Sequence, residues 1–214
     1  MQGGGGIQAS PVFIPPTASA ATTYGRLAKG GRMAAANVWL DFFDANTHYT
    51  GPRLTDAMAA AAERTLGYAL PASYLKLIRV KNGGVPRRQC YPTSGSHWSD
   101  NHVRIVTVFG IGGQWGIDSE EFGSRHWIEQ AGLPEIGIAV GMTPTAGHDA
   151  IMLDYSVCGP KGEPRVVFVD PEDDLTAVLA ADFAEFLGGL VDCRPYDEAR
   201  DRELEEYRRR SQSG

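Results

Sequence analysis

Residues 147–170, GHDAIMLDYSVCGPKGEPRVVFVD, are the stretch that most limits the choice of possible folds. They contain two runs, 150–155 and 165–169, in which Ile, Leu, Val, Phe and Tyr dominate. Such side chains favour strands, and the Gly- and Pro-containing segment between the runs favours a turn, so the pattern predicts a β-hairpin. Polar side chains flank both runs and are the first candidates for chemistry: His148, Asp149, Asp154, Glu163 and Asp170.

The composition is that of an ordinary globular protein, with 214 residues of which 43% are hydrophobic and 21% charged. This length suits one large domain or two small ones, and we expect one. The net charge of −6 argues against a nucleic-acid partner, which would require a basic face, but is compatible with a basic protein partner. No apolar run approaches the roughly 20 residues of a membrane-spanning helix, so we expect no membrane partner.

The three cysteines, Cys90, Cys158 and Cys193, are widely spaced and form no CxxC motif. This pattern predicts neither a disulfide framework nor a zinc knuckle. It favours a reducing compartment, and the cytoplasm is the simplest choice.

The ends of the chain differ from its middle. Residues 1–32 are rich in Gly, Pro, Ala and Thr, and we expect a disordered leader. The leader is either natural or lies upstream of a true start at Met33. Residues 33–193 are expected to form the folded domain, and residues 194–214 a charged tail that is partly helical.

Hydrophobic spacing and capping residues predict the other elements. Thr55 can cap one helix, Pro71 can open the next, and Asp182 has a capping-box partner three residues later. The run Asn82-Gly83-Gly84 is expected to end the Pro71 helix through a left-handed cap. The helices expected are residues 34–43, 55–65, 72–80, 122–131 and a short helix after Asp182, and the strands outside the hairpin are residues 103–111 and 135–140.

Three groupings of reactive side chains were weighed as active sites. The first pairs Cys158 as a nucleophile with His148 and Asp149. Cys158 lies in a Gly/Pro-rich loop with no helix N-terminus to lower its pKa, which weakens this hypothesis.

The second grouping is a metal site formed by His97, Asp100 and His102, with or without His148. These residue types bind metals, but their spacing is not a specific signature, and they can equally organise the loop before the strand at residues 103–111.

The third grouping is a carboxylate pair of Asp154 with Glu163 or Asp170, as in glycoside hydrolysis. No aromatic platform for a sugar accompanies it, and polar residues beside strands commonly satisfy loop backbone groups instead. The sequence also lacks a phosphate loop and a GxSxG elbow. We therefore expect no catalytic residues, no metal and no cofactor, and conclude that the chain is not an enzyme.

Four segments in fixed order resemble the SUKH superfamily: LGYALPASYLKLIRVKNGG (66–84), AGHDAIMLDYS (146–156), GEPRVVFVDPE (162–172) and LAADFAEFLGGL (179–190). The resemblance covers about residues 39–191. This superfamily includes bacterial toxin-immunity proteins and fungal regulators of cell-wall assembly. The resemblance implies a single SUKH-like α+β domain, with a mixed, mostly antiparallel sheet flanked by helices.

The resemblance also implies a function in protein binding. Bacterial members commonly neutralise polymorphic toxins, often nucleases, so a bacterial cytoplasmic immunity protein with a cognate toxin as partner is the leading hypothesis. A regulatory scaffold unrelated to toxins is the alternative, and a metal-dependent or Cys/His hydrolase is a third. The oligomeric state is left open.

Residues of the shared segments are expected to maintain the fold as helix cap, turn and hairpin geometry: Asn82, Gly83, Gly84, Gly147, His148, Asp149, Asp154, Glu163 and Pro164. Toxin-binding residues should lie in the irregular loops between residues 91 and 132, because specificity must vary between toxins. Trp98 and Trp115 are the expected anchors, with core packing as the alternative for each. Carboxylates and one histidine could complement a basic toxin: His97, Asp118, Glu120 and Glu121.

Overall fold

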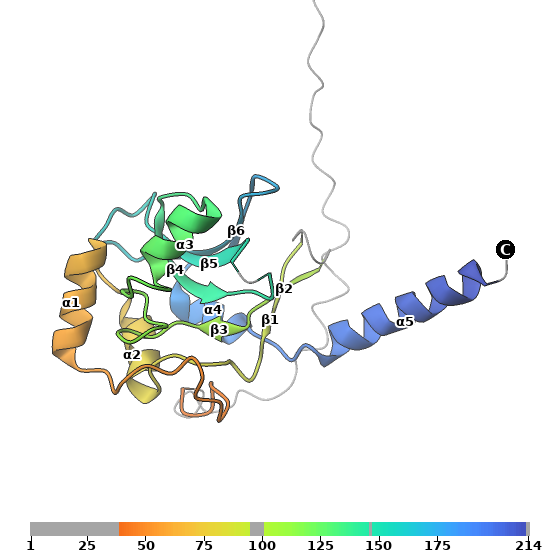
Figure 1. Cartoon of the computed structure of the whole chain (residues 1–214), viewed down its shortest axis with the longest axis horizontal. Helices are drawn as coiled ribbons and strands as arrows, with labels where there is room; N and C mark the ends of the chain where they lie inside the picture. Colours follow the sequence, from red (N-terminus) through yellow and green to blue (C-terminus); the bar gives the residue numbers. More distant parts are fainter. Residues whose placement is uncertain (1–38, 95–100, 146, 213–214) are drawn as a thin grey trace, which may run out of the picture. The chain divides into compact units, whose positions relative to one another are not determined.

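The predicted hairpin lies at the centre of a five-stranded sheet (Figure 1). The computed structural model describes residues 39–94, 101–145 and 147–212. Every pairing between neighbouring named strands is antiparallel. In spatial order the strands of the larger sheet are β3 (Thr107–Val108), β4 (Gly137–Met142), β5 (Ala150–Asp154), β6 (Arg165–Asp170) and β7 (Leu175–Ala180).

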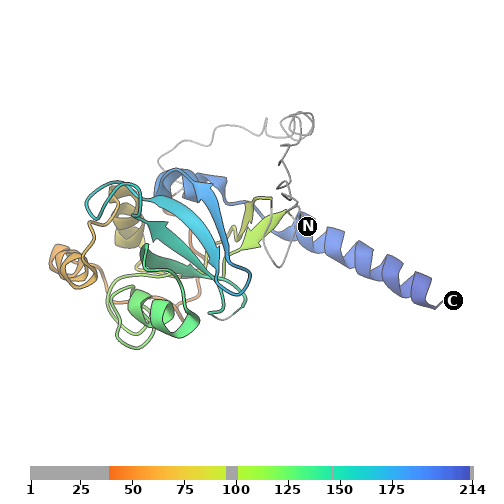
Figure 2. The same cartoon turned by 90° about the horizontal axis from the view of Figure 1, so that it is seen from above.

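Helices cover both faces of this sheet. Alternate strand residues point to opposite faces, so each face builds its own cluster. Ile151 and Phe168 belong to the larger cluster, which includes side chains of α1 (Asp56–Leu66), α2 (Ala72–Val80) and α4 (Phe183–Gly189). Met152 and Val167 belong to the smaller cluster, beneath α3 (Ser124–Ala131). Figure 2 shows α3 and α4 on opposite sides of the sheet. The α+β fold class is confirmed.

Several helix boundaries follow the predicted capping chemistry. Thr55 Oγ1 accepts a hydrogen bond from the Met58 N–H at 3.2 Å at the start of α1, which ends at Gly67 in the left-handed region with φ 82°. Asp182 Oδ1 accepts from the Glu185 N–H at 2.8 Å at the start of α4. The register from Ala150 opposite Val169 to Asp154 opposite Arg165 confirms the predicted hairpin.

Two element predictions are wrong. The strand expected at residues 103–111 is divided, because Ile105 N–H donates to Gln89 O at 2.7 Å whereas Val106 N–H donates to Met142 O at 2.7 Å. The chain therefore changes sheets there: β2 (His102–Arg104) pairs with β1 (Cys90–Pro92), and β3 pairs with β4. Of the helix expected at 34–43, residues 34–38 lie outside the described residues. Residues 39–41 form a turn, Phe43 forms a β-bridge with Pro86, and Phe42 and Phe43 are both buried.

The expected absence of a disulfide bond is also wrong. Cys90 and Cys193 are bonded across 103 positions of sequence, with Cα atoms 5.2 Å apart. Val191 pairs with Cys90 through two backbone hydrogen bonds of 2.8 and 3.1 Å, and this pairing brings Cys193 back beside β1. Cys193 immediately precedes α5 (Arg194–Ser211), an 18-residue charged helix with no buried residue. The bond therefore ties the start of α5 to β1.

The disulfide bond is tested by counting thiols. Under denaturing, non-reducing conditions we expect only Cys158 to react with a thiol reagent, and all three cysteines to react after reduction. Reduction should lower the free energy of unfolding by about 2–4 kcal/mol, because the unfolded chain regains the freedom that the closed loop removed. The variant Cys158→Ser is the control and should show no reactive thiol before reduction. Three reactive thiols in the unreduced protein would contradict the bond.

Candidate functional site

The side chain of Asn82 joins two loops that are distant in sequence. Its Nδ2 donates to Pro52 O at 2.5 Å and to Ile111 O at 2.7 Å, and its Oδ1 accepts from the Ile111 N–H at 2.8 Å. Its own carbonyl accepts from the Gly51 N–H at 2.7 Å. Asn82 does not form the predicted left-handed cap, because α2 ends at Lys81 in extended backbone. Its amide serves as a cross-link between the two loops.

Two glycines after Asn82 let the 107–111 segment approach closely. Gly83 has φ 87°, and a Cβ there would lie 2.7 Å from Gly110 N, so a larger residue would push the segments apart. Gly84 and Val108 exchange two backbone hydrogen bonds of 3.0 Å. The Asn82-Gly83-Gly84 run thus holds the start of the loop that carries Trp115.

That loop is braced from within. Asp118 Oδ1 accepts from the Gly112 N–H at 2.6 Å, and Ile117 N–H donates to Gly110 O at 2.9 Å. The buried Tyr74 hydroxyl donates to Phe109 O at 2.8 Å at the start of the loop. Asp118, predicted to contact the toxin, therefore has a bracing contact within its own loop.

Trp115 lies in a half-buried aromatic group on this loop and also packs against the larger core cluster. Its ring stacks on Phe122 with centroids 4.6 Å apart, and Tyr49 meets it edge-on at 5.1 Å. All three rings are half-buried, whereas Glu120 and Glu121 between them in sequence are exposed. We call this group, Tyr49, Trp115, Glu120, Glu121 and Phe122, the Trp115 surface. An aromatic centre with a carboxylate rim is suited to binding a basic protein face.

Other predicted site residues are not assembled with it. His97, Trp98 and Asp100 lie outside the described residues. His102 stacks on Tyr196 of α5 at 4.1 Å. Burial lowers the pKa of His102, and the neighbouring Arg104 lowers it further. Within the described ranges, no group of three His, Cys, Asp or Glu residues could hold a metal ion.

Strand β5 separates Cys158 from His148 and Asp149, so the proposed nucleophile and its partners do not meet. His148 precedes β5 and Cys158 follows it, so a strand about 17 Å long lies between them at roughly 3.3 Å per residue. His148 Nδ1 lies 2.6 Å from Glu172 Oε1, and Asp149 accepts hydrogen bonds from the hydroxyls of Thr143 and Thr145. These residues are placed to connect loops and not to act as a nucleophile and base.

The carboxylates considered as an acid–base pair have separate roles. Asp154, 1% exposed, accepts from Arg165 Nε at 2.7 Å and from the Ser156 N–H at 2.8 Å. Burial raises the pKa of Asp154, but the hydrogen bonds from Ser156 and Arg165 outweigh burial and hold it below its ordinary value. Asp170, at the far end of β6, accepts the Glu172 N–H at 3.0 Å in the next turn. Burial raises the pKa of the Glu163 carboxyl, and Asp182 raises it further.

Gly147 and Pro164 stand at the two ends of the hairpin. Gly147 has φ 113°, and a Cβ there would lie 2.2 Å from the Trp127 ring. Pro164 is buried immediately before β6. The absence of a side chain at Gly147 and the buried ring of Pro164 therefore help to set the path of the chain into β5 and β6.

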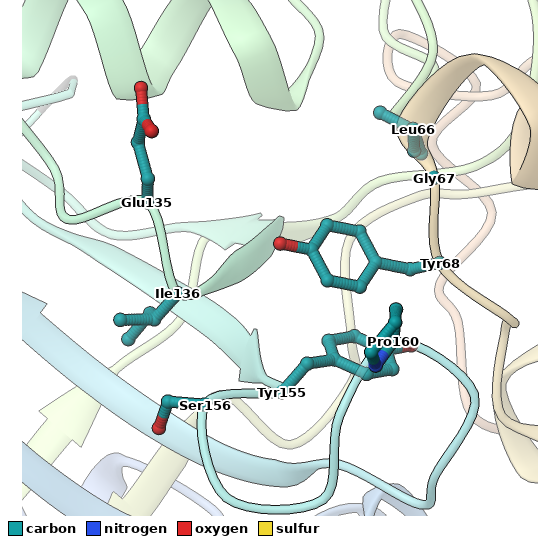
Figure 3. Close-up of a pocket in the computed structure, with 8 residues that line it drawn as sticks. All are labelled: Leu66, Gly67, Tyr68, Glu135, Ile136, Tyr155, Ser156 and Pro160. Carbon is teal, nitrogen blue, oxygen red and sulfur yellow. The ribbon is translucent and has the colours of Figure 1, made fainter.

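Sequence reasoning missed an open pocket of about 430 Å³, shown in Figure 3. It lies between the end of α1, the residues before β4 and the turn after β5. Tyr68 and Tyr155 form one wall, with ring centroids 4.5 Å apart, and the Tyr155 hydroxyl donates to Ala69 O at 2.6 Å. The other lining residues are Leu66, Gly67, Glu135, Ile136, Ser156 and Pro160. Tyr68 and Tyr155 both belong to segments that resemble the superfamily, which was the available signal.

A sheet with helices on both faces and loop-borne aromatic residues defines an α+β protein suited to binding other proteins. The chain belongs to the SMI1 / KNR4 family (SUKH-1), whose model matches residues 53–189. The resemblance inferred from four segments is thereby confirmed. Members of this family include toxin-immunity proteins and fungal regulators, typically bind partner proteins, and are generally not enzymes. Comparison with curated proteins and with solved structures found no match. No described helix is long and apolar enough to cross a membrane.

The role of Asp154 is tested by the pH dependence of stability. Because its pKa is lower in the folded state, its stabilising contribution is complete above the unfolded value of about 4 and is lost as pH falls through the folded value. Asp154→Asn should therefore be less stable than wild type at pH 7, and urea unfolding should show the difference shrinking below about pH 4. Asp201→Asn, on exposed α5, should stay within about 0.5 kcal/mol of wild type throughout. A constant difference for Asp154→Asn down to pH 2 would contradict this assignment.

Proposed function

We propose that this chain is an immunity protein that binds a cognate bacterial polymorphic toxin and neutralises it by protein–protein contact. Membership of the SUKH-1 family supports a binding function, since family members typically bind partner proteins. The observation that carries the proposal is the Trp115 surface, an aromatic centre on a loop braced by Asp118.

The electrostatics favour a basic partner. Glu120 and Glu121 are exposed at the rim of the Trp115 surface, and the whole chain carries a net charge of −6. Toxins that act on nucleic acids present basic faces to phosphates, so a nuclease is a candidate class of toxin. Covering such a face would both bind the toxin and exclude its substrate.

Location in the cytoplasm is part of this proposal, because an immunity protein must meet its toxin in the producing cell. The disulfide bond is evidence against a reducing compartment, since such bonds are rare there. The redox state of Cys90 and Cys193, in protein isolated from cells under thiol-trapping conditions, decides between a reducing cytoplasm and an oxidising compartment.

The proposal is tested by co-expression with the product of the neighbouring open reading frame. We expect that product to be toxic alone, and this chain to rescue growth and to co-purify with it. Trp115→Ala should weaken the complex by about 2–4 kcal/mol, or roughly 30- to 1,000-fold in Kd, because it removes the central anchor. Reversing both rim charges, Glu120→Lys with Glu121→Lys, should slow association and reduce its salt dependence.

Tyr207→Ala is the control, since this aromatic residue is 70% exposed on α5, outside the Trp115 surface, and its loss should leave Kd within about twofold. A toxic neighbour that is neither bound nor neutralised would contradict the proposal. Binding that survives both Trp115→Ala and the charge reversal would place the interface elsewhere.

A further inference from the structure

Strand β7 forms one edge of the five-stranded sheet. It pairs with β6 from Asp170 opposite Leu175 to Val166 opposite Ala180. Within the described ranges, residues Leu175–Val178 make no hydrogen bond outside this pairing, whereas Leu179 O accepts from the Tyr91 hydroxyl at 2.5 Å. At the opposite edge, β3 is bridged by Gly84 through two hydrogen bonds. One edge is therefore covered, and at the other edge, within the described ranges, the backbone groups of residues 175–178 that point away from β6 are unpaired.

The sequence of β7, LTAVLA, lacks the usual protection of an open edge. Natural sheets discourage edge-to-edge pairing with Lys, Pro or inward-pointing charges, and this strand has none of them. In the described pairing of β6 with β7, the one register shift lies beside Leu179, at the end already covered by Tyr91. An open and uncharged edge of this kind is suited to accept an added strand.

Side chains along β7 differ on its two faces. Leu175 and Ala177 pack against the larger core cluster. Thr176 and Val178 are exposed, and Val178 is 53% accessible although its partner on β6, Val167, is fully buried. An added strand would therefore find an apolar contact at Val178 on the face that also carries α3.

Both ends of this edge are acidic. The turn that leads into β7 carries Glu172, Asp173 and Asp174, all exposed. At the other end Glu163 and Asp182 are close enough for Asp182 to raise the pKa of Glu163, and Glu185 is exposed nearby on α4. The basic residues at these ends already have acidic partners, with His148 paired to Glu172 and Arg165 to Asp154.

This charge distribution disfavours a second copy of the chain as the occupant. An antiparallel pairing of two β7 strands would place the acidic turn of one copy against Asp182 of the other. A parallel pairing would place turn against turn. Either arrangement brings like charges together, which is destabilising.

We propose that the open edge of β7 binds an extended segment of a partner protein by β-strand addition. The segment has an uncharged, β-branched centre and a basic residue near each end. Its backbone pairs with Leu175–Val178, one of its side chains contacts Val178, and its basic ends face the two acidic groups. This site is separate from the Trp115 surface, so it adds a second binding function to the proposed one.

The probe is a fluorescein-labelled peptide, Lys-Thr-Val-Thr-Val-Thr-Val-Lys, whose terminal lysines lie about 23 Å apart when extended, slightly more than the length of β7. Titration with the full chain should raise its fluorescence anisotropy to saturation. Hydrogen exchange should slow in the complex at those backbone amides of residues 175–178 that point away from β6. Lys-Thr-Val-Pro-Pro-Thr-Val-Lys has the same charge but lacks one central N–H on each edge, and should bind at least about tenfold more weakly.

Val178→Lys should weaken binding of the first peptide by at least about tenfold, because it places a charge beside the apolar centre of the added strand. Val157→Lys is the matched control, since Val157 is also an exposed valine, lies in the turn after β5, and should leave binding within about twofold. A peptide with glutamate in place of both lysines should bind more weakly, and the loss should diminish at high salt.

Equal binding of the two lysine peptides, or of Val178→Lys and Val157→Lys, would overturn the proposal. Failure of the peptide to bind, together with a dimer of the wild type that Val178→Lys dissociates, would overturn it in favour of self-association. The peptide test and the toxin test can fail independently. Trp115→Ala should leave peptide binding unchanged, and Val178→Lys should leave the rescue of growth from the toxin unchanged.

Discussion

The amide of Asn82 is the contact on which the arrangement of the binding loops depends. It is 4% exposed and makes three hydrogen bonds to the backbone of two loops, at Pro52 and Ile111. One of these loops carries Tyr49 and the other carries Trp115, whose rings are 5.1 Å apart. A buried amide that loses its partners leaves unsatisfied groups at about 1–3 kcal/mol each, so this geometry is strongly specified. Asn82 therefore acts as a positioning residue for the Trp115 surface.

The polar residues of the central hairpin are of types that suggested catalysis, but their side chains make structural contacts instead. Asp154 is committed to Arg165 and Ser156, Asp149 to two threonine hydroxyls, and His148 to Glu172. Each has a partner that stabilises one strand end or loop. Strand β5 separates Asp154 from His148 and Asp149, which lie together at the other end of the strand, so Asp154 cannot act on the same substrate atom as these two residues.

Local signals in the sequence predicted local structure well. The hairpin, the Thr55 cap and the Asp182 cap all follow from residues within a few positions of one another. The family could also be inferred, because its segments keep their order along the chain.

Features that depend on distant partners could not be inferred in this way. The change of sheet at Ile105 depends on Gln89 and Met142, and the disulfide bond depends on Val191 returning to Cys90. The pairing of Tyr49 with Trp115 across 66 positions likewise has no local signature. Of the predicted anchors, Trp115 is in an aromatic group on a surface loop, whereas Trp98 lies outside the described residues.

The positioning role of Asn82 is tested most directly by native-state hydrogen exchange on Asn82→Ala. The amides to follow are Gly112 and Ile117, which donate to Asp118 and Gly110 and not to Asn82. We expect both to exchange at least about tenfold faster than in wild type, and more strongly accelerated than the amides of β5, because the whole loop loosens. Gln130→Ala, which removes an exposed amide on α3, should change neither. Unchanged exchange at Gly112 and Ile117 in Asn82→Ala would contradict the account.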